Sequence, residues 1–373
     1  QQVIDALLHY YQDCCANIHR AVYDSAEEAT SLYEAAREKA AAFINAADPS
    51  EIIFTKGTTE GINFVATAWA LNHIKAGDEI VVTHAEHHSN LLPWQRVAQQ
   101  RGAQLVVIPI DKTTYTVVSP ETFLTTKTRL VAVSQSSNVI GPIWNNQAKQ
   151  FENFIDAAQH HGALVLIDAA QSIAHQHVDV QKLGADFLAF SGHKLFGPTG
   201  IGVLYINKKH HVDIEPYQLG GSMIQEVSLQ HASWAPAPLK FEAGTPPIAS
   251  AIGLGAAIDY ITKNIDWKDL HKHEAALCAQ LIDGLEKIPG LIIVGNRDKL
   301  RTDGHLVSIA FEDLHTHDVA ALLGAEGIAV RAGHACAQPL VNHLGFDSLL
   351  RISLAAYNTS EEIDYCLQTL KTS

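Results

Sequence analysis

The chain has few basic residues, few cysteines and no long apolar run. Lysine and arginine total 26 against 40 aspartates and glutamates, which gives a formal net charge of −14. Proteins that bind nucleic acid normally carry a basic face, so this balance argues against that class. No apolar run approaches the roughly 20 residues that cross a bilayer, and no signal-peptide pattern opens the chain. We therefore expect neither nucleic acid nor a membrane as a partner.

Cysteine is scarce, with five residues and no C-x-x-C pair. An odd number without such a pair favours a reducing compartment, so we expect a cytoplasmic protein. Cys278 and Cys366 fall in apolar stripes of predicted helices, where free cysteines commonly pack as small hydrophobic residues. Cys14 and Cys15 are adjacent on a predicted helix and have the same ordinary explanation.

Cys336 has a different setting. The segment from Arg331 to Pro339 shows no apolar period, and Gly333 and Pro339 enclose it as a predicted loop. The thiol should therefore be reachable, and the neighbouring His334 and Arg331 favour the thiolate, which is the nucleophilic form. An exposed cysteine without a function remains the alternative on these residues alone.

The alternation of short β-rich runs with helical stretches predicts an α/β fold with a mostly parallel sheet. With 373 residues, 47% of them apolar, the chain can bury a large core in about two domains. We assign residues 1–258 to the large domain and 259–373 to a smaller α+β domain. A helix at 247–262 bridges the two, and the N-terminal helix is expected to pack on the small domain. The large domain has predicted strands at 52–55, 79–83, 104–110, 129–134, 163–168, 187–191 and 201–206, with helices at 58–73, 90–101 and 146–161.

The small domain is predicted from three long amphipathic helices and three short strands. The helices fall at 266–288, 316–326 and 360–371, and the strands at 291–294, 304–311 and 328–331.

A lysine follows the predicted strand 187–191, in the run Ser191-Gly192-His193-Lys194. A lysine is usually a solvated surface charge. One that is held at a strand end among uncharged neighbours loses its proton readily and can form a Schiff base. Lys194 is therefore a candidate catalytic residue.

Two other strand ends carry residues that suit a ligand site. Strand 163–168 ends on Asp168, and an acid there is costly unless it has a partner. Strand 52–55 runs into Gly57-Thr58-Thr59 and then a helix, where free backbone N–H groups and hydroxyls suit a phosphate. An ordinary helix cap is the alternative for the second group.

A Schiff-base lysine, a buried acid, a phosphate cradle and an aromatic ring together describe a pyridoxal 5′-phosphate site. With these residues the sequence resembles the class V branch of fold-type-I pyridoxal-phosphate enzymes, and within it the group II, or Suf-type, cysteine desulfurases. The resemblance covers essentially the whole chain. Its motifs are Gly57 to Asn63, Glu86 to Asn90, Asp168 to Gln171, Ser191 to Lys194, Phe241 to Pro246 and, most specific of all, Arg331 to Pro339.

The resemblance implies a role for each matching residue at the cofactor. Lys194 is the Schiff-base lysine, Asp168 pairs with the pyridinium N–H and Gln171 bonds the ring oxygen. His87 stacks on the ring and assists proton transfer. The implied phosphate ligands are Thr59, Ser191, His193 and, from the other subunit of a homodimer, Thr245.

The resemblance also implies the substrate and the reaction. Asn138 and Arg351 hold the amino acid, with Arg331 and Arg20 on the substrate side as well; an arginine fork suits a carboxylate. L-Cysteine gives up its sulfur to Cys336 and leaves as alanine. The persulfide then passes to a sulfur-acceptor protein of the SufE/CsdE type, for iron–sulfur cluster assembly or related sulfur transfer.

Some positions depart from the family pattern, and other functions stay open. Ala335 replaces a usual histidine, and Gln135-Ser136-Ser137 replaces a histidine-containing form. These changes leave the choice between cysteine and selenocysteine open, and other class V lyases or a transaminase are the nearest alternatives. A metal protein is disfavoured because the 21 histidines include no H-E-x-x-H motif, so we expect no metal site.

Overall fold

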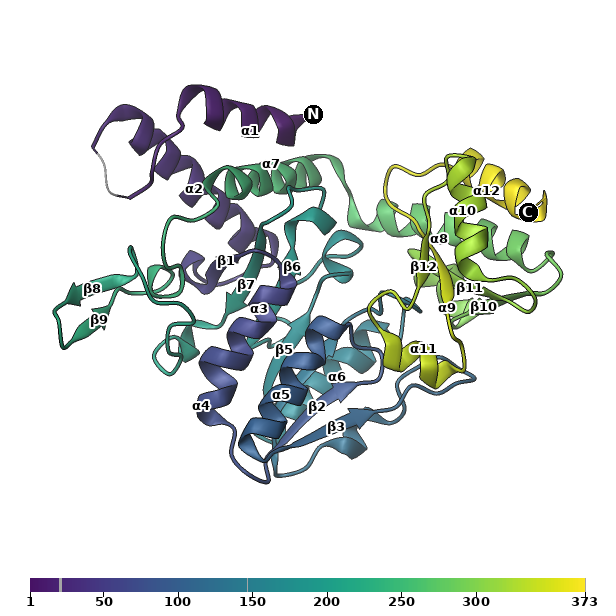
Figure 1. Ribbon diagram of the computed structural model, residues 1–373, viewed down its shortest axis with the longest axis horizontal. Helices are drawn as coiled ribbons and strands as arrows, with labels where there is room; N and C mark the ends of the chain where they lie inside the picture. Colours follow the sequence, from purple (N-terminus) through teal and green to yellow (C-terminus); the bar gives the residue numbers. More distant parts are fainter. Residues whose placement is uncertain (20–21, 146, 373) are drawn as a thin grey trace.

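The main sheet of the computed structural model, which describes residues 1–19, 22–145 and 147–372, is mostly parallel (Figure 1). Within these residues it has seven strands in the order β1-β7-β6-β5-β4-β2-β3. β7 is antiparallel to both β1 and β6, and the other neighbours are parallel. The strands are β1 (Ile52–Thr55), β2 (Glu79–Thr83), β3 (Gln104–Ile108), β4 (Thr128–Ser134), β5 (Leu164–Asp168), β6 (Phe187–Ser191) and β7 (Gly202–Ile206).

Helices cover both faces of this sheet, which explains why its strands are nearly continuous apolar runs. Along β1, Ile52 and Phe54 pack in one core and Ile53 packs in the other, because successive side chains point to opposite faces. The helices of the large part are α1 (Gln2–Asp13), α2 (Asp24–Phe43), α3 (Thr58–Phe64), α4 (Leu71–His73), α5 (Leu92–Arg101), α6 (Gln147–His160) and α7 (Ile248–Asn264). A π-helical turn at Val65–Ala70 joins α3 to α4.

The C-terminal part forms its own core around an antiparallel sheet of order β10-β11-β13-β12. The strands are β10 (Leu291–Val294), β11 (Leu306–Phe311), β12 (Arg331–Gly333) and β13 (Leu349–Ser353). The helices are α8 (Trp267–Leu285), α9 (Arg297–Asp303), α10 (Thr316–Ala325), α11 (Gln338–Leu344) and α12 (Ser360–Thr372). Local signals set their ends: the Asp266 side chain accepts from two backbone N–H groups at the start of α8, and left-handed Gly345 ends α11.

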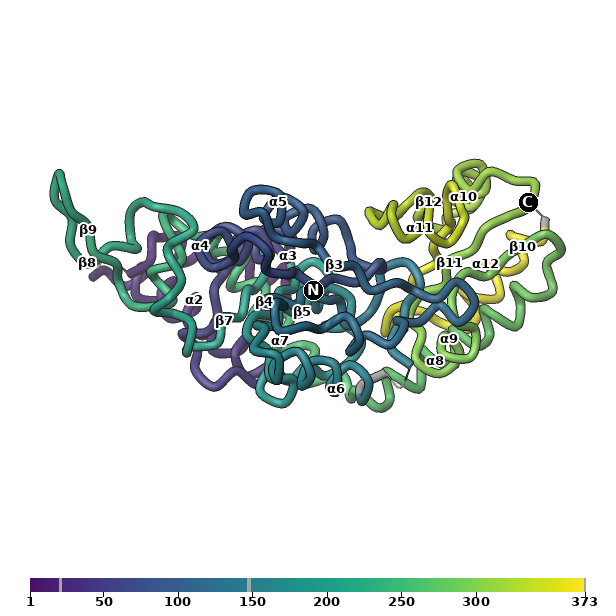
Figure 2. Tube along the Cα trace, turned by 90° about the horizontal axis from the view of Figure 1, so that it is seen from below, coloured from purple at the N-terminus to yellow at the C-terminus, as the bar shows by residue number. Residues whose placement is uncertain are grey.

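Two features lie outside these layers. Helix α1 packs along α7 at the edge of the large part (Figure 1). A hairpin of β8 (Ile224–Val227) and β9 (Ala232–Trp234) extends away from the body of the molecule (Figure 2). None of the helices described is long and apolar enough to cross a membrane.

The predicted α/β fold is confirmed, and all seven predicted strands of the large sheet are present. Cys278 and Cys366 are buried in the C-terminal core, as their helical stripes predicted. Cys14 and Cys15 follow α1 and do not lie within it, because the helix ends at Asp13. The domain boundary between residues 258 and 259 stays a prediction, and it falls inside α7.

One close backbone approach sets the position of the α3 N-terminus. A Cβ on Gly202 of β7 would lie 2.5 Å from the Gly57 Cα and 2.6 Å from the Phe190 carbonyl oxygen. Only glycine permits this contact, since real Cβ atoms essentially never come so close.

Gly202→Ala should therefore lower the free energy of unfolding by about 1–3 kcal/mol, the usual cost of overpacking. Gly324→Ala is the matched control, because nothing lies within 4 Å of a Cβ added there in α10. It should be neutral or stabilise by up to about 1 kcal/mol. Urea unfolding of both variants checks the prediction, and equal effects would contradict it.

Candidate active site

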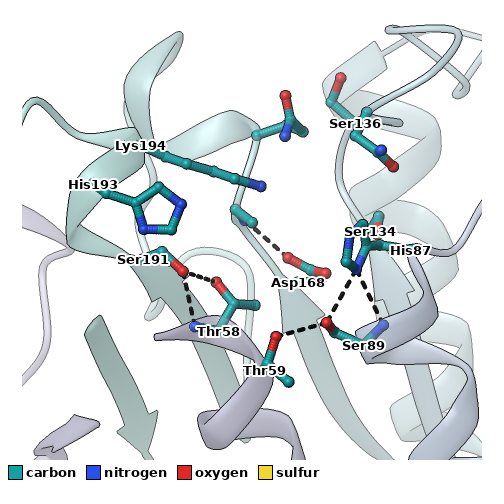
Figure 3. Close-up of a pocket in the computed structure, with 13 residues that line it drawn as sticks. Thr58, Thr59, His87, Ser89, Ser134, Ser136, Asp168, Ser191, His193 and Lys194 are labelled. Atoms are coloured by element: carbon teal, nitrogen blue, oxygen red, sulfur yellow. Dashed lines mark hydrogen bonds between the residues drawn. The ribbon is translucent and has the colours of Figure 1, made fainter. Parts of the chain in front are cut away.

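The carboxyl ends of the central strands open into one cavity of about 170 Å³ (Figure 3). β1 and β6 run in the same direction because both are antiparallel to β7, so their ends share an edge with those of β4 and β5. Ligands in sheets of this kind bind at that edge. The predicted residues that line the cavity are Thr59, His87, Asn138, Asp168, Gln171, Ser191, His193 and Lys194.

Lys194 and Asp168 are the charged centre of the cavity. Burial lowers the pKa of Lys194, while the Asp168 carboxylate acts in the opposite direction. Burial likewise raises the pKa of Asp168, and Lys194 opposes that shift. Asp168 Oδ1 accepts a hydrogen bond of 2.9 Å from the Ala170 N–H. The environment therefore favours a neutral amine on Lys194, which is the form that reacts with a carbonyl.

Hydroxyls and a helix start form the second part of the cavity. Ser191 Oγ accepts from the Thr58 N–H at 2.9 Å and forms a hydroxyl–hydroxyl hydrogen bond with Thr58 Oγ at 2.8 Å. Thr59 Oγ lies 2.7 Å from Ser89 Oγ. Gly57, with φ at +151°, makes the turn from β1 into α3. Hydroxyls beside the free N–H groups of a helix start suit an anion such as phosphate.

His87 lines the cavity and is held in place by Ser89 (Figure 3). Its Nδ1 accepts from the Ser89 N–H at 3.1 Å, so the ring proton of the neutral tautomer lies on Nε2. Burial, Lys194 and Arg351 lower the pKa of His87 to about 4. A neutral ring results, as a stacking role requires.

Glu86 holds the segment that carries His87 in place. The sequence suggested no role for this residue. Its carboxylate is fully buried and accepts from Thr83 Oγ, Asn90 Nδ2 and Ser134 at 2.6–3.1 Å. Burial nevertheless raises the pKa of Glu86 to about 7. Its bonds tie the β2–α5 loop, which carries His87, to the end of β4.

The loop of Cys336 comes from the C-terminal part and is docked on the large part. The His88 N–H donates to the Cys336 carbonyl at 2.8 Å, and the Gln338 N–H donates to His88 Nε2 at 3.1 Å. Asn138 Nδ2 donates to the Ala335 carbonyl at 2.6 Å. The thiol itself is exposed.

The backbone of this loop is strained where it carries the thiol. Ala335 and Cys336 have φ of +48° and +58°. The left-handed region costs a residue other than glycine roughly 1–2 kcal/mol. The hydrogen bonds from His88 and Asn138 offset this cost, so the docked conformation depends on them.

Two arginines stand beside the loop. Arg331 of β12 pairs directly with Arg351 of β13, so both side chains leave the same face of the sheet. Burial and the neighbouring Arg331 lower the pKa of Arg351, and the Cys336 thiol opposes the shift. Arg351 donates to the Asn138 carbonyl at 2.8 Å, and within the described residues its buried Nε has no hydrogen-bond partner. The pair is suited to bind a carboxylate.

The remaining predicted positions lie elsewhere. Thr245 is exposed, on the loop before α7, and does not line the cavity. Arg20 falls outside the described residues. Five further residues line the cavity. Thr58 belongs to the anion site predicted at Gly57-Thr58-Thr59, and the sequence suggested no role for the other four: Ser89, Ser134, Ser136 and Ala170.

The residues present fit pyridoxal phosphate. Among the described residues, the Asp168 carboxylate accepts one hydrogen bond, from the Ala170 N–H, so this buried group still lacks a cationic hydrogen-bond donor such as a pyridinium N–H. The hydroxyl cradle lies on one side of it and Lys194 on the other (Figure 3). A buried acid, a reactive amine and an anion cradle are the groups that this cofactor requires.

Comparison with known proteins agrees with this site. The family model Aminotransferase class-V matches residues 1–366. A probable cysteine desulfurase of Halalkalibacterium halodurans is 47% identical over 97% of this chain and 87% of the relative. The cysteine desulfurase of Synechococcus elongatus is 44% identical over 98% of this chain and 57% of that relative.

Two solved structures are similar over 100% of this chain and 90% of theirs. The cysteine desulfurase CsdA from Escherichia coli, in its S-sulfonic acid form, has a TM-score of 0.89 at 38% identity. The apo cysteine desulfurase from Thermococcus onnurineus has a TM-score of 0.92 at 40% identity.

The fold and the site together define a fold-type-I enzyme whose cofactor is pyridoxal phosphate. The chain belongs to the class-V aminotransferase family, and within that family to the cysteine desulfurases.

A group of potential metal ligands lies outside this cavity. Ligand atoms of His9, Cys14 and Glu28 lie within 4.8 Å of one another. The His9 ring already contacts Asp13 at 2.9 Å and Glu28 at 3.1 Å. That the protein binds no metal stays a prediction.

Loss of the His88 ring should loosen the Cys336 loop. In a Cys15→Ser background, which removes the other exposed thiol, His88→Ala should speed modification of Cys336 by a thiol reagent about fivefold. That factor corresponds to about 1 kcal/mol, the usual worth of one hydrogen bond. His160→Ala, at an exposed position of α6, is the control and should leave the rate of Cys336 modification unchanged. Unchanged reactivity in His88→Ala would show that the ring does not hold the loop.

The lowered pKa of His87 predicts a dependence of stability on pH. The folded state favours the neutral ring of His87. The contribution of this ring to the free energy of unfolding is therefore fully present above the unfolded pKa of 6.5 and is lost as pH falls toward about 4. Because the ring is partly exposed, we expect a discounted effect of about 1–2 kcal/mol. Between pH 7 and 4.5 the free energy of unfolding should therefore fall by about 1–2 kcal/mol less in His87→Gln than in the parent, as measured by denaturant unfolding. His160→Gln should behave as the parent does.

Proposed function

We propose that this cysteine desulfurase transfers the sulfur of L-cysteine to the thiol of Cys336 and releases L-alanine. The observation that carries the proposal is the docking of the Cys336 loop, by His88 and Asn138, beside the cavity that contains Lys194 and Asp168. A lyase or transaminase that uses the same cavity would not need a thiol at this place.

Lys194 handles the proton at the substrate Cα. When bound, pyridoxal phosphate supplies the electron sink that makes this proton acidic. The buried amine is inclined to the neutral form, so Nζ can take the Cα proton and later return it. Asp168, fully buried at the end of β5, supplies the negative charge that a protonated ring nitrogen needs.

The Cys336 thiolate attacks the substrate sulfur. A bond forms between Cys336 Sγ and that sulfur as the Cβ–S bond of the substrate breaks. The electron pair of the broken bond stays on Cβ, which takes a proton and becomes the methyl group of alanine. Sulfur remains on the enzyme as a persulfide, and the exposed position of Cys336 leaves it accessible to a second protein.

Arg351 and Asn138 position the substrate. The unpartnered Nε of Arg351 is available for the carboxylate, and its bond to the Asn138 carbonyl fixes its direction. Arg331 adds positive charge on the same face of the sheet. Removing either arginine should weaken binding of the amino acid more than binding of the cofactor.

We further propose the partners that the family implies. A sulfur acceptor of the SufE/CsdE type takes the persulfide sulfur, and L-selenocysteine is a second possible substrate. A homodimer places Thr245 at the cofactor phosphate of the other subunit; its exposure outside the cavity of its own chain supports this arrangement. A cytoplasmic location stays a prediction.

Cys336→Ser tests the proposal most simply. The variant should keep the cofactor absorbance at roughly 420 nm, because the thiol does not hold the cofactor. It should lose sulfide and alanine production from L-cysteine almost completely. Both products are measured against Cys15→Ser, the matched exposed cysteine, which should retain full activity. Undiminished sulfide release from Cys336→Ser would refute the assignment.

A further inference from the structure

A second polar cavity of about 50 Å³ lies between the two parts of the chain. Ser136 and His175 line it from the large part, and Glu274 and His305 from the C-terminal part. None of the residues from the C-terminal part serves in the proposed reaction. The cavity nevertheless touches the active site, because Ser136 lines both cavities.

Three ionisable side chains in this cavity form an ordered group. His175 Nδ1 lies 2.8 Å from Glu274 Oε1, and Glu274 is buried. The His175 and His305 rings stack with centroids 3.9 Å apart and an interplanar angle of 18°. Burial, His175 and Arg351 hold the pKa of His305 well below its usual value, so its ring is neutral.

Two residues of the lining each have a buried polar atom without a hydrogen-bond partner among the described residues: His305 Nε2 and Ser136 Oγ. Both side chains are more than nine-tenths buried. Leaving such a group unsatisfied costs about 1–3 kcal/mol, so native proteins usually supply a partner such as an ordered water.

The size of the cavity suits water. The cavity exceeds the roughly 10–15 Å³ that is needed to hold a water molecule, so ordered water fits in it. Such water can bridge polar atoms that do not contact each other. His271, which is exposed, and Asp303, which is half-buried, also line the cavity, so its lining reaches the protein surface; their side chains lie 3.1 Å apart.

We propose that Ser136, the waters of this cavity and the His305 ring, which His175 holds in place by stacking, form a proton path between bulk solvent and the active site. The inference rests on the proposed role of Lys194. The Cys336 loop docks at the active site through His88 and Asn138, whereas this path reaches the active site through Ser136.

Only protons move along this path. Lys194 gains a proton when the Cα–H bond breaks, and an ammonium hydrogen passes through water to the Ser136 hydroxyl. Each hydroxyl, water or neutral imidazole accepts one proton and donates another. A proton leaves to solvent as a different one enters, so no group changes its net charge and no oxidant or reductant is needed.

The test follows exchange of the Cα hydrogen of L-alanine in D₂O by proton NMR. All variants are made on Cys336→Ser, because exchange requires the cofactor and Lys194 but not the thiol. Ser136→Val and His305→Phe should each slow the exchange by at least about tenfold, since a positioned proton-transfer group usually contributes that much or more. Ser136→Thr restores the hydroxyl and should restore the rate.

His84→Phe is the matched control. His84 also has a buried unpartnered nitrogen and packs on another histidine ring, His343, at 4.2 Å, but it lines neither cavity. The His84→Phe variant should exchange the Cα hydrogen of L-alanine at the rate of the parent. Cofactor absorbance and the unfolding transition of each variant establish that the protein is folded and loaded.

A crystal structure gives a second readout that is independent of turnover. It should show ordered waters bonded to Ser136 Oγ and His305 Nε2, and a dry cavity overturns the inference. Exchange at the parent rate in both Ser136→Val and His305→Phe overturns it as well, while leaving the proposed function intact. Absence of any exchange in the Cys336→Ser parent contradicts the role of Lys194 itself, and the inference fails with it.

Discussion

Burial of two opposite charges at adjacent strand ends is the constraint on which this site depends. Removing an ion from water costs roughly several kcal/mol even in a relaxed protein interior. Lys194 and Asp168 meet that cost only in part through each other, and each is shifted toward its neutral form. Such a pair is poorly stabilised alone and well suited to a ligand that brings a cation to the acid and a carbonyl to the amine. The chemistry of the cavity follows from this imbalance.

The proposed nucleophile, Cys336, comes from a different part of the chain, so the proposed site is complete only when the two parts are docked. His88 and Asn138 hold a loop whose backbone is in a costly conformation at Ala335 and Cys336. A few hydrogen bonds therefore balance backbone strain closely. In the function that we propose, this loop would bring the thiol to the substrate while Cys336 stays exposed to a second protein.

The parallel strands could be predicted because they are short apolar runs separated by turn residues, and their ends located Asp168, Ser191 and Lys194. Helix α2 was missed because its buried face consists largely of alanine, which gives a weak apolar period. Thr58 and Thr59 could be placed together in an anion site at a helix start, but only packing shows that Thr58 contacts Ser191. The contact of His88 with Cys336 joins residues far apart in sequence, so no local pattern indicates it.

In the function that we propose, sulfur moves from the substrate to Cys336, on a loop docked at the cofactor cavity. Mass spectrometry of peptides from the protein, taken after brief incubation with L-cysteine and alkylation, tests it directly. We expect one added sulfur atom on the peptide that contains Cys336, formed at the same rate as alanine, and none on the peptide that contains Cys15. Alanine formation with no added sulfur on Cys336, or with the sulfur on another cysteine, would contradict it.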